Sequence, residues 1–134
     1  MTRTLFIGLA AALVSTAATA QQRPMHEDQR IRQGFHDFYT AREIDDNCDA
    51  ISLRRLAALG FYNSMVSYAR SAGYTRADFK ALEDNDAVKD AFKAELRAEL
   101  AARGATKGNA AGFCAVGYEE ISRGTEAGKL LKGN

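Results

Sequence analysis

The sequence has few residues of several informative kinds. It contains two cysteines, two histidines and one proline among 134 residues, and its 18 Lys+Arg and 17 Asp+Glu give a formal net charge of +1. Two cysteines are too few for a disulfide-dense miniprotein or a four-cysteine zinc site. A balanced charge leaves no electrostatic footprint for nucleic acid. The remaining composition, 46% hydrophobic and 26% charged, is typical of a globular protein with one domain.

Local motifs for catalysis and metal binding are also missing. The sequence has no H-E-x-x-H, C-x-x-C or G-x-S-x-G pattern. Asp45, Asn47 and Asp49 occupy positions 1, 3 and 5 of a calcium loop, but Ala50 and Leu56 stand where that loop needs Gly and a bidentate Glu. We interpret this stretch as an acidic helix end, with weak surface binding of calcium as the alternative.

The histidines and paired carboxylates do not suggest a catalytic site either. His36 lies off the apolar face of its predicted helix, so we expect a solvated side chain rather than a general base. Glu119 and Glu120 are adjacent, so we expect them to point to different faces of a helix and not to form a dyad. The sequence therefore predicts no catalytic residue, no metal and no cofactor.

The first twenty residues show the three parts of a secretory signal peptide in order. Arg3 supplies the basic region, residues 5–14 are apolar apart from one glycine, and Ala18-Thr19-Ala20 fits a cleavage site. This apolar run is about half of the roughly 20 residues that cross a bilayer. We predict cleavage after Ala20, location in the periplasm or the secreted fraction, and no integral membrane segment after cleavage. An uncleaved anchor or a buried N-terminal helix is the alternative.

Both cysteines, Cys48 and Cys114, remain after the predicted cleavage. Export leads to an oxidising compartment, so we interpret them as one disulfide. Closing the long loop between them would stabilise the fold by ~4 kcal/mol in the chain-entropy model. Two free thiols or an intermolecular bridge are the alternatives.

Hydrophobic periodicity predicts a single all-α domain over residues 21–134, with an ordered core at about 28–131 and a frayed lead-in before it. No segment alternates with period two. The expected fold is a small bundle of four to five short helices clamped by one disulfide. The first four expected helices run over about 28–47, 53–72, 75–84 and 87–103, and a fifth follows the polar loop 106–109 and fades near residue 124. Within the fourth we expect Glu99 to pair with Arg103.

The second of these helices has the clearest apolar pattern. Ser52 is its expected N-cap and Gly73 its expected C-terminal glycine. We expect this helix to lie centrally with more than one face covered, and Gly60 to allow the close approach of another backbone. The residues that support this are the stripe Leu56, Leu59, Val66 and Ala69, widened by Leu53, Phe61 and Met65.

Four residues on or beside this helix form a candidate binding surface: Tyr62, Asn63, Tyr68 and Tyr74. Tyrosines with a polar tip suit protein interfaces, although they also rim the cores of small domains. Asn63 lies on the apolar stripe, so it is either a buried residue satisfied by a turn or part of a polar pocket.

The sequence resembles a family of small exported proteins from alphaproteobacteria that is catalogued as a domain of unknown function. The resemblance extends over about residues 40–131 and implies export and paired cysteines, but no activity or catalytic residue. It rests on the segments Asn47–Ser52, Gly60–Ser64, Ala69-Arg70, Gly73-Tyr74, Arg103-Gly104, Cys114 and Glu120–Gly124.

These observations favour a non-enzymatic helical protein of the periplasm that acts by binding another protein. The alternative is an acid-stress chaperone, since such chaperones are also small, helical and clamped by one disulfide. An enzyme whose site is assembled from distant residues is the third hypothesis.

Overall fold

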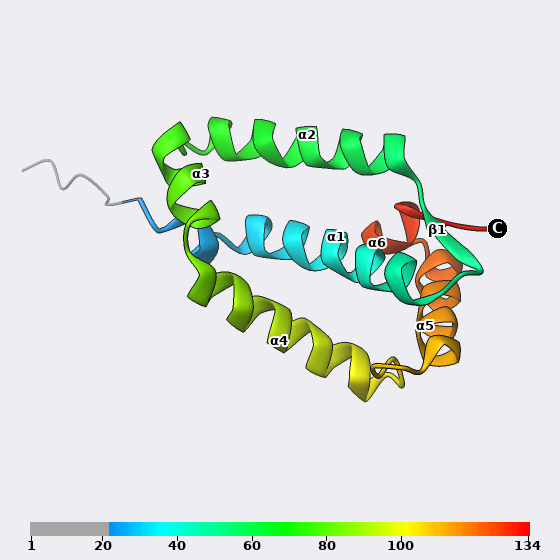
Figure 1. Cartoon of the computed structure of the whole chain (residues 1–134). Coiled ribbons are helices and arrows are strands. Elements are labelled where there is room, and N and C mark those ends of the chain that lie inside the picture. The colour runs from blue at the N-terminus through cyan, green and yellow to red at the C-terminus, as the bar shows by residue number, and fades with distance from the viewer. Residues whose placement is uncertain (1–21) are drawn as a thin grey trace, which may run out of the picture.

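The computed structural model describes residues 22–134; the predicted signal peptide, residues 1–20, lies outside the described residues. Figure 1 shows helices connected by short turns, with one small sheet near the C-terminus. The predicted all-α fold is confirmed, with six α-helices, the last a single turn, in place of the expected four or five. The elements are η1 (Met25–Glu27), α1 (Gln29–Asn47), β1 (Ile51–Leu53), α2 (Arg55–Ser71), α3 (Arg76–Glu83), α4 (Asp86–Ala102), α5 (Ala110–Arg123), α6 (Glu126–Lys129) and β2 (Leu131–Gly133).

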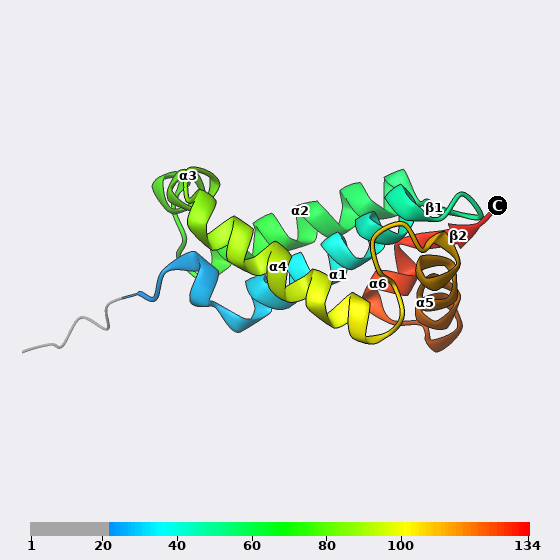
Figure 2. The ribbon, with the colours of Figure 1, turned by 60° about the horizontal axis from the view of Figure 1, so that its bottom comes forward.

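Helix α1 is the central element of the fold. It contacts η1, β1, α2, α4, α5 and α6, and Figure 2 shows α4 crossing it. The carboxylate of Asp28 begins the helix by accepting the backbone N–H groups of Arg30 at 2.9 Å and Ile31 at 3.0 Å, which satisfies two of the donors that a helix N-terminus leaves free. The expectation that the second helix is central was therefore wrong, because α2 lies at the edge of the molecule (Figure 1).

The main hydrophobic core lies where α1, α4, α5 and α6 meet. Helix α5 approaches α1 closely at Gly117, where an added Cβ would lie 2.5 Å from Ile51 Cδ1 and 2.7 Å from Ile44 Cγ2. Close packing of this kind leaves no room for an extra methyl group. The most buried members of the cluster are Ala41, Ile44, Cys48, Ile51, Leu96, Leu100, Ala105, Val116, Ala127, Leu130 and Leu131.

The predicted disulfide between Cys48 and Cys114 is present, with the two Cα atoms 5.2 Å apart. Cys48 is the C-cap of α1 and Cys114 lies on α5. The bridge therefore joins the end of α1 to α5. Within residues 22–134 neither thiol is free.

A two-stranded antiparallel sheet was not predicted. Ile51 pairs with Gly133 and Leu53 with Leu131, so each strand has three residues, too few to show an alternating pattern. Ser52, the expected N-cap of the second helix, lies in β1 and its hydroxyl bonds to the Asn134 side chain. Helix α2 begins three residues later, at Arg55, without a side-chain cap.

The segment before α1 is packed rather than frayed. Met25 is 5% exposed and forms a second, smaller cluster with Ile31, Ala69 and Tyr74. The side chain of Gln22 donates a hydrogen bond to the carbonyl of Ala72 at 2.7 Å. Packing thus begins before residue 28, the expected start of the ordered core.

Helix α2 packs against α1 through one face. An added Cβ on Gly34 of α1 would lie 2.0 Å from the sulfur of Met65, whereas an added Cβ on Gly60 of α2 would meet no atom within 4 Å beyond the backbone of its own helix. Gly34 is therefore the glycine that allows these helices to approach, and the expectation for Gly60 was wrong. Within the part of the chain described here, no helix is long and apolar enough to cross a membrane.

Candidate functional site

The solvent-facing side of α2 carries exposed apolar side chains. Leu56 is 86% exposed, Leu59 55% and Tyr62 61%. Asn63 is exposed beside them, and Val66 is partly buried at the edge of the same face. These five residues recur at steps of three and four, so they form one continuous row, which we call the outer row of α2.

The outer row contains most of the stripe that the sequence pattern assigned to the core. Only Ala58 and Ala69 of α2 are buried, while Phe61 and Met65 face inward and are partly buried. The helix is thus apolar on two faces, and α1 covers one of them. Asn63 was expected to be either buried and satisfied by a turn or part of a polar pocket, and it is exposed instead, because it lies on the uncovered face.

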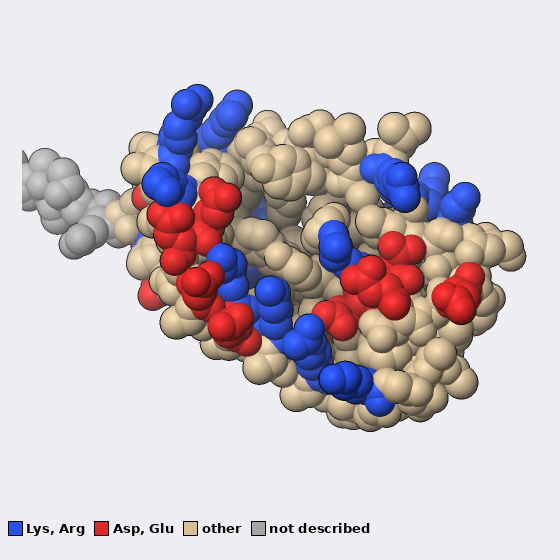
Figure 3. All heavy atoms as spheres, in the orientation of Figure 1, with Lys and Arg blue, Asp and Glu red and all other residues tan. Residues whose placement is uncertain are grey.

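The row is framed by positive charge. Arg55 lies four residues before Leu59, and Arg70 lies four residues after Val66. In Figure 3, Lys and Arg stand at both ends of the upper edge, where α2 begins and ends in Figure 1, and the atoms between them are neither basic nor acidic. No Asp or Glu occurs between Asp49 and Asp78. The sequence analysis did not single out these arginines, although the absence of acidic residues between Asp49 and Asp78 could have pointed to them.

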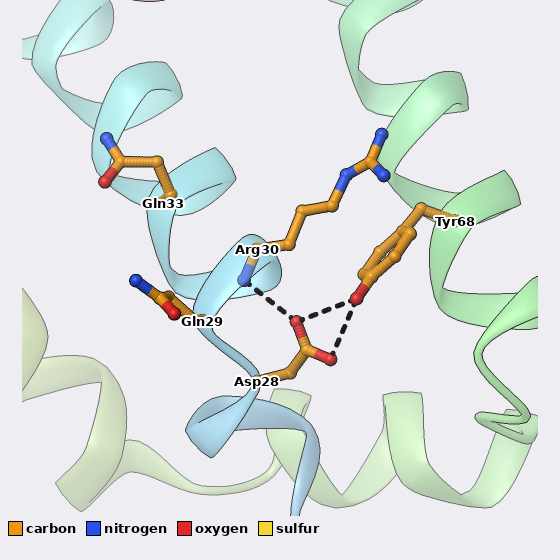
Figure 4. A pocket seen from close by; sticks show the side chains of 5 residues that line it. All are labelled: Asp28, Gln29, Arg30, Gln33 and Tyr68. Atoms are coloured by element: carbon orange, nitrogen blue, oxygen red, sulfur yellow. Dashed lines mark hydrogen bonds between the residues drawn. The ribbon is translucent and has the colours of Figure 1, made fainter.

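Tyr68 and Tyr74, the other two candidate residues, belong to a different cluster. Figure 4 shows the Tyr68 hydroxyl directed at the carboxylate of Asp28, which it reaches at 3.2 Å. The Tyr74 hydroxyl donates to the same carboxylate at 3.5 Å. The guanidinium of Arg30 lies 4.3 Å from the centre of the Tyr68 ring, a cation–π distance. The predicted binding surface is therefore divided, with Tyr62 and Asn63 outward on α2 and the other two tyrosines tied to the start of α1.

This junction is structural in its chemistry. Burial raises the pKa of Tyr68 and of Tyr74, and their hydrogen bonds to Asp28 and its charge act in the same direction. Asp28 accepts four donors in total, so its oxygens are occupied. The open pocket beside it, about 500 Å³, is lined by Asp28, Gln29, Arg30, Gln33 and Tyr68 (Figure 4).

His36 lies on α1, and its side chain forms an ion pair with Glu99 of α4 instead of facing solvent as expected. Its Nε2 is 2.8 Å from the Glu99 carboxylate and its Nδ1 is 3.6 Å from that of Asp37. Asp37 and Glu99 raise the pKa of His36 to about 9 against the opposing effect of burial. The imidazole is then protonated at neutral pH, when a general base must be neutral.

Arg103 is the ion-pair partner of both Glu119 and Glu120. Its Nη2 lies 3.1 Å from Glu119 and 2.6 Å from the buried Glu120. The two carboxylates were expected to point apart, yet both reach this guanidinium, which links α5 to the end of α4. The expected pair of Glu99 with Arg103 is replaced by this cluster and by the contact of Glu99 with His36.

The acidic stretch that resembles a calcium loop has a structural use. Asp45 accepts the backbone N–H of Leu53 at 2.9 Å and so fixes the turn into β1. Among residues 22–134, no group of three His, Cys, Asp or Glu side chains is arranged to hold a metal ion.

These features define a class: a small, disulfide-linked helical protein with one uncovered apolar helix face. The chain belongs to the Family of unknown function (DUF5333), whose model matches residues 23–132. This confirms the resemblance to a family of unknown function; export and an alphaproteobacterial origin stay predictions. Comparison with curated proteins and with solved structures finds no match.

Proposed function

We propose that the protein is exported, has no enzymatic activity, and acts by binding another protein through the outer row of α2. The observation that carries the proposal is the exposure of Leu56, Leu59 and Tyr62 along one helix face. Helix α2 is apolar on two faces and α1 covers only one of them, and a contiguous exposed apolar face marks an interaction site.

Photo-crosslinking in the cells that make the protein tests the binding role. A photoreactive residue in place of Leu59 or Tyr62 should give a discrete adduct with a second protein. The same residue in place of Ala98, which is exposed on α4, is the control and should give none. Adducts from Ala98 alone, or from neither helix, would contradict the proposal.

Two further measurements test the remaining parts of the proposal. The mature protein isolated from the periplasm or medium should begin at Gln21, as read by its mass. A saturable turnover by the purified protein that one side-chain change abolishes would show that it is an enzyme instead.

An acid-activated chaperone is the second candidate function, and the contact between α1 and α4 favours it. Three ion pairs cross this contact, each with a carboxylate that acid would neutralise, and a cluster of Phe35, Tyr39 and Phe92 lies between the helices. The protein should then suppress the light scattering of an aggregating client at about pH 3, and a lack of suppression would exclude the role. The pairs are Arg32–Glu95 at 3.2 Å, Arg97–Glu43 at 3.4 Å and His36–Glu99 at 2.8 Å.

A further inference from the structure

The charges around the outer row of α2 specify the chemistry of its partner. Helix α2 is the one α-helix among residues 22–134 that contains no Asp or Glu. Most basic residues of α1 and α4 are matched by carboxylates within 4 Å, as in the pairs of Arg42 with Asp46 and Lys89 with Asp86. Neither Arg55 nor Arg70 has such a partner among the described residues. Their charge is thus available to an external group.

The two arginines lie on the same side of the helix as the apolar row. Arg55, Leu59, Val66 and Arg70 are separated by steps of four, seven and four residues, which keeps them on one face of an α-helix. At ~1.5 Å per residue, the fifteen steps from Arg55 to Arg70 span about 22 Å. The face is therefore about four turns long and has a cation at each end, with the apolar row over about three turns between them.

Gly60 supplies an independent observation. It lies on the exposed side of α2 with no atom within 4 Å of an added Cβ. A glycine inside a helix costs about 1 kcal/mol relative to alanine, and within the described chain no close contact explains it. Because Gly60 has no side chain, a second backbone can come near the helix there, beside Leu56 and Asn63.

We infer that the partner of the outer row is an amphipathic helix of another protein, with apolar residues at three- and four-residue spacing and carboxylates at both ends to meet Arg55 and Arg70. This inference rests on the proposed function, because it names the chemistry of the protein that the same face binds. Helix-in-groove recognition uses this spacing of anchors, and complementary charges at the rim set partner choice and orientation.

A second copy of the chain fits the face less well. If two α2 helices packed through their outer rows, in either direction, arginine would lie opposite arginine at each end, and like charges in that position are repulsive. A lipid surface also fits less well, because Gly60, Asn63 and Ser67 lie in the middle of the exposed face. A bilayer gains little from glycine and polar side chains, whereas a protein backbone can pack on the first and hydrogen-bond to the others.

The test uses the photoreactive residue at position 59 in the full chain. Arg55→Glu together with Arg70→Glu should lower the adduct yield at least five-fold, while Arg55→Lys with Arg70→Lys should retain most of it. Lys107→Glu, a charge reversal at an exposed residue between α4 and α5, is the matched control and should leave the yield unchanged. Mass spectrometry of the adduct should identify a peptide with net negative charge.

Gly60→Ala separates binding from folding. The change should raise the melting temperature of the free protein, because alanine favours the helix and meets no neighbour, yet it should lower the adduct yield. An unchanged yield would overturn the close approach at Gly60. Circular dichroism of each variant shows that it is folded.

The outcomes distinguish this inference from the proposed function. No adduct at all contradicts the proposed function itself. An adduct whose yield stays the same in Arg55→Glu with Arg70→Glu contradicts the acidic character of the partner but not the proposed function. An adduct of twice the mass of the chain would show a second copy, and an adduct with phospholipid would show a membrane surface; either result would overturn the inference.

Discussion

At the scale of single residues, polar side chains in this protein mostly fix the positions of helices. Asp28 caps α1 and also accepts hydrogen bonds from the hydroxyls of Tyr68 and Tyr74. One carboxylate therefore joins the start of α1 to the end of α2 and the turn that follows it. His36 joins α1 to α4 through Glu99 in a similar way. The partners of Asp28 and His36 in the fold thus explain both side chains as structural groups.

The pairing of His36 predicts a pH-dependent contribution to stability. Its pKa in the folded protein, about 9, lies above the ordinary value of 6.5, so the contribution is complete below about pH 6.5 and is lost as the pH rises through 9. Urea unfolding should show that His36→Gln lowers the free energy of unfolding by roughly 1–2 kcal/mol at pH 6, after allowance for solvent screening of the pair, and by much less at pH 10.

His26→Gln, which removes the chain's other histidine, is the control for this measurement. If His36→Gln lowers the free energy of unfolding by the same amount at pH 6 and pH 10, the charge of His36 does not contribute to the stability of the contact.

At the scale of elements, the fold depends on where helices meet closely. Gly117 lies against the side chains of Ile44 and Ile51, and Gly128 of α6 lies against the backbone of α5, where an added Cβ would be 2.0 Å from the Glu120 carbonyl oxygen. Helix α2 has no such contact around Gly60. Gly117 and Gly128 thus allow close approaches within the fold, whereas Gly60 does not, and the sequence does not show this difference.

The same substitution should have opposite effects at two of these positions. Gly60→Ala should raise the free energy of unfolding by about 0.5–1 kcal/mol, because it gains helix propensity without a clash. Gly128→Ala should lower it by roughly 2 kcal/mol or more, because backbone must move to admit the methyl group. Thermal unfolding followed by circular dichroism measures both, and a loss of stability in Gly60→Ala would show that another element covers α2 in the free protein.

At the scale of the whole molecule, the disulfide and the small sheet close the fold. Cys48 and Cys114 link the central helix to α5, and β2 brings the last residues of the chain onto β1, next to the start of α2. The start of the described chain is held by the packing of Met25 with Ala69 and Tyr74, and its last residues are held by the pairing of β2 with β1.

Removal of the disulfide should lower the free energy of unfolding by several kcal/mol, since the loop between the cysteines is long and the chain-entropy model gives ~4 kcal/mol. Urea unfolding of Cys48→Ala with Cys114→Ala measures the loss. Denaturing mass spectrometry with and without reductant should show the two hydrogens of one bridge. A double variant as stable as the wild type would show that helix packing alone holds the fold.

The sequence by itself determined the helical class, the approximate ends of most helices and the cysteine pair. These depend on local spacing, on caps such as the box of Thr75 with Asp78, and on the even count of cysteines. It could not determine which helix is central, because α2 is apolar on two faces and periodicity does not show which of them is covered. Tertiary structure decided this, since α1 packs against Phe61 and Met65 and leaves Leu56, Leu59 and Tyr62 in solvent. The sequence thus named Tyr62 and Asn63 of the candidate site, whereas Leu56 and Leu59 joined it only when the fold showed which apolar face remained uncovered.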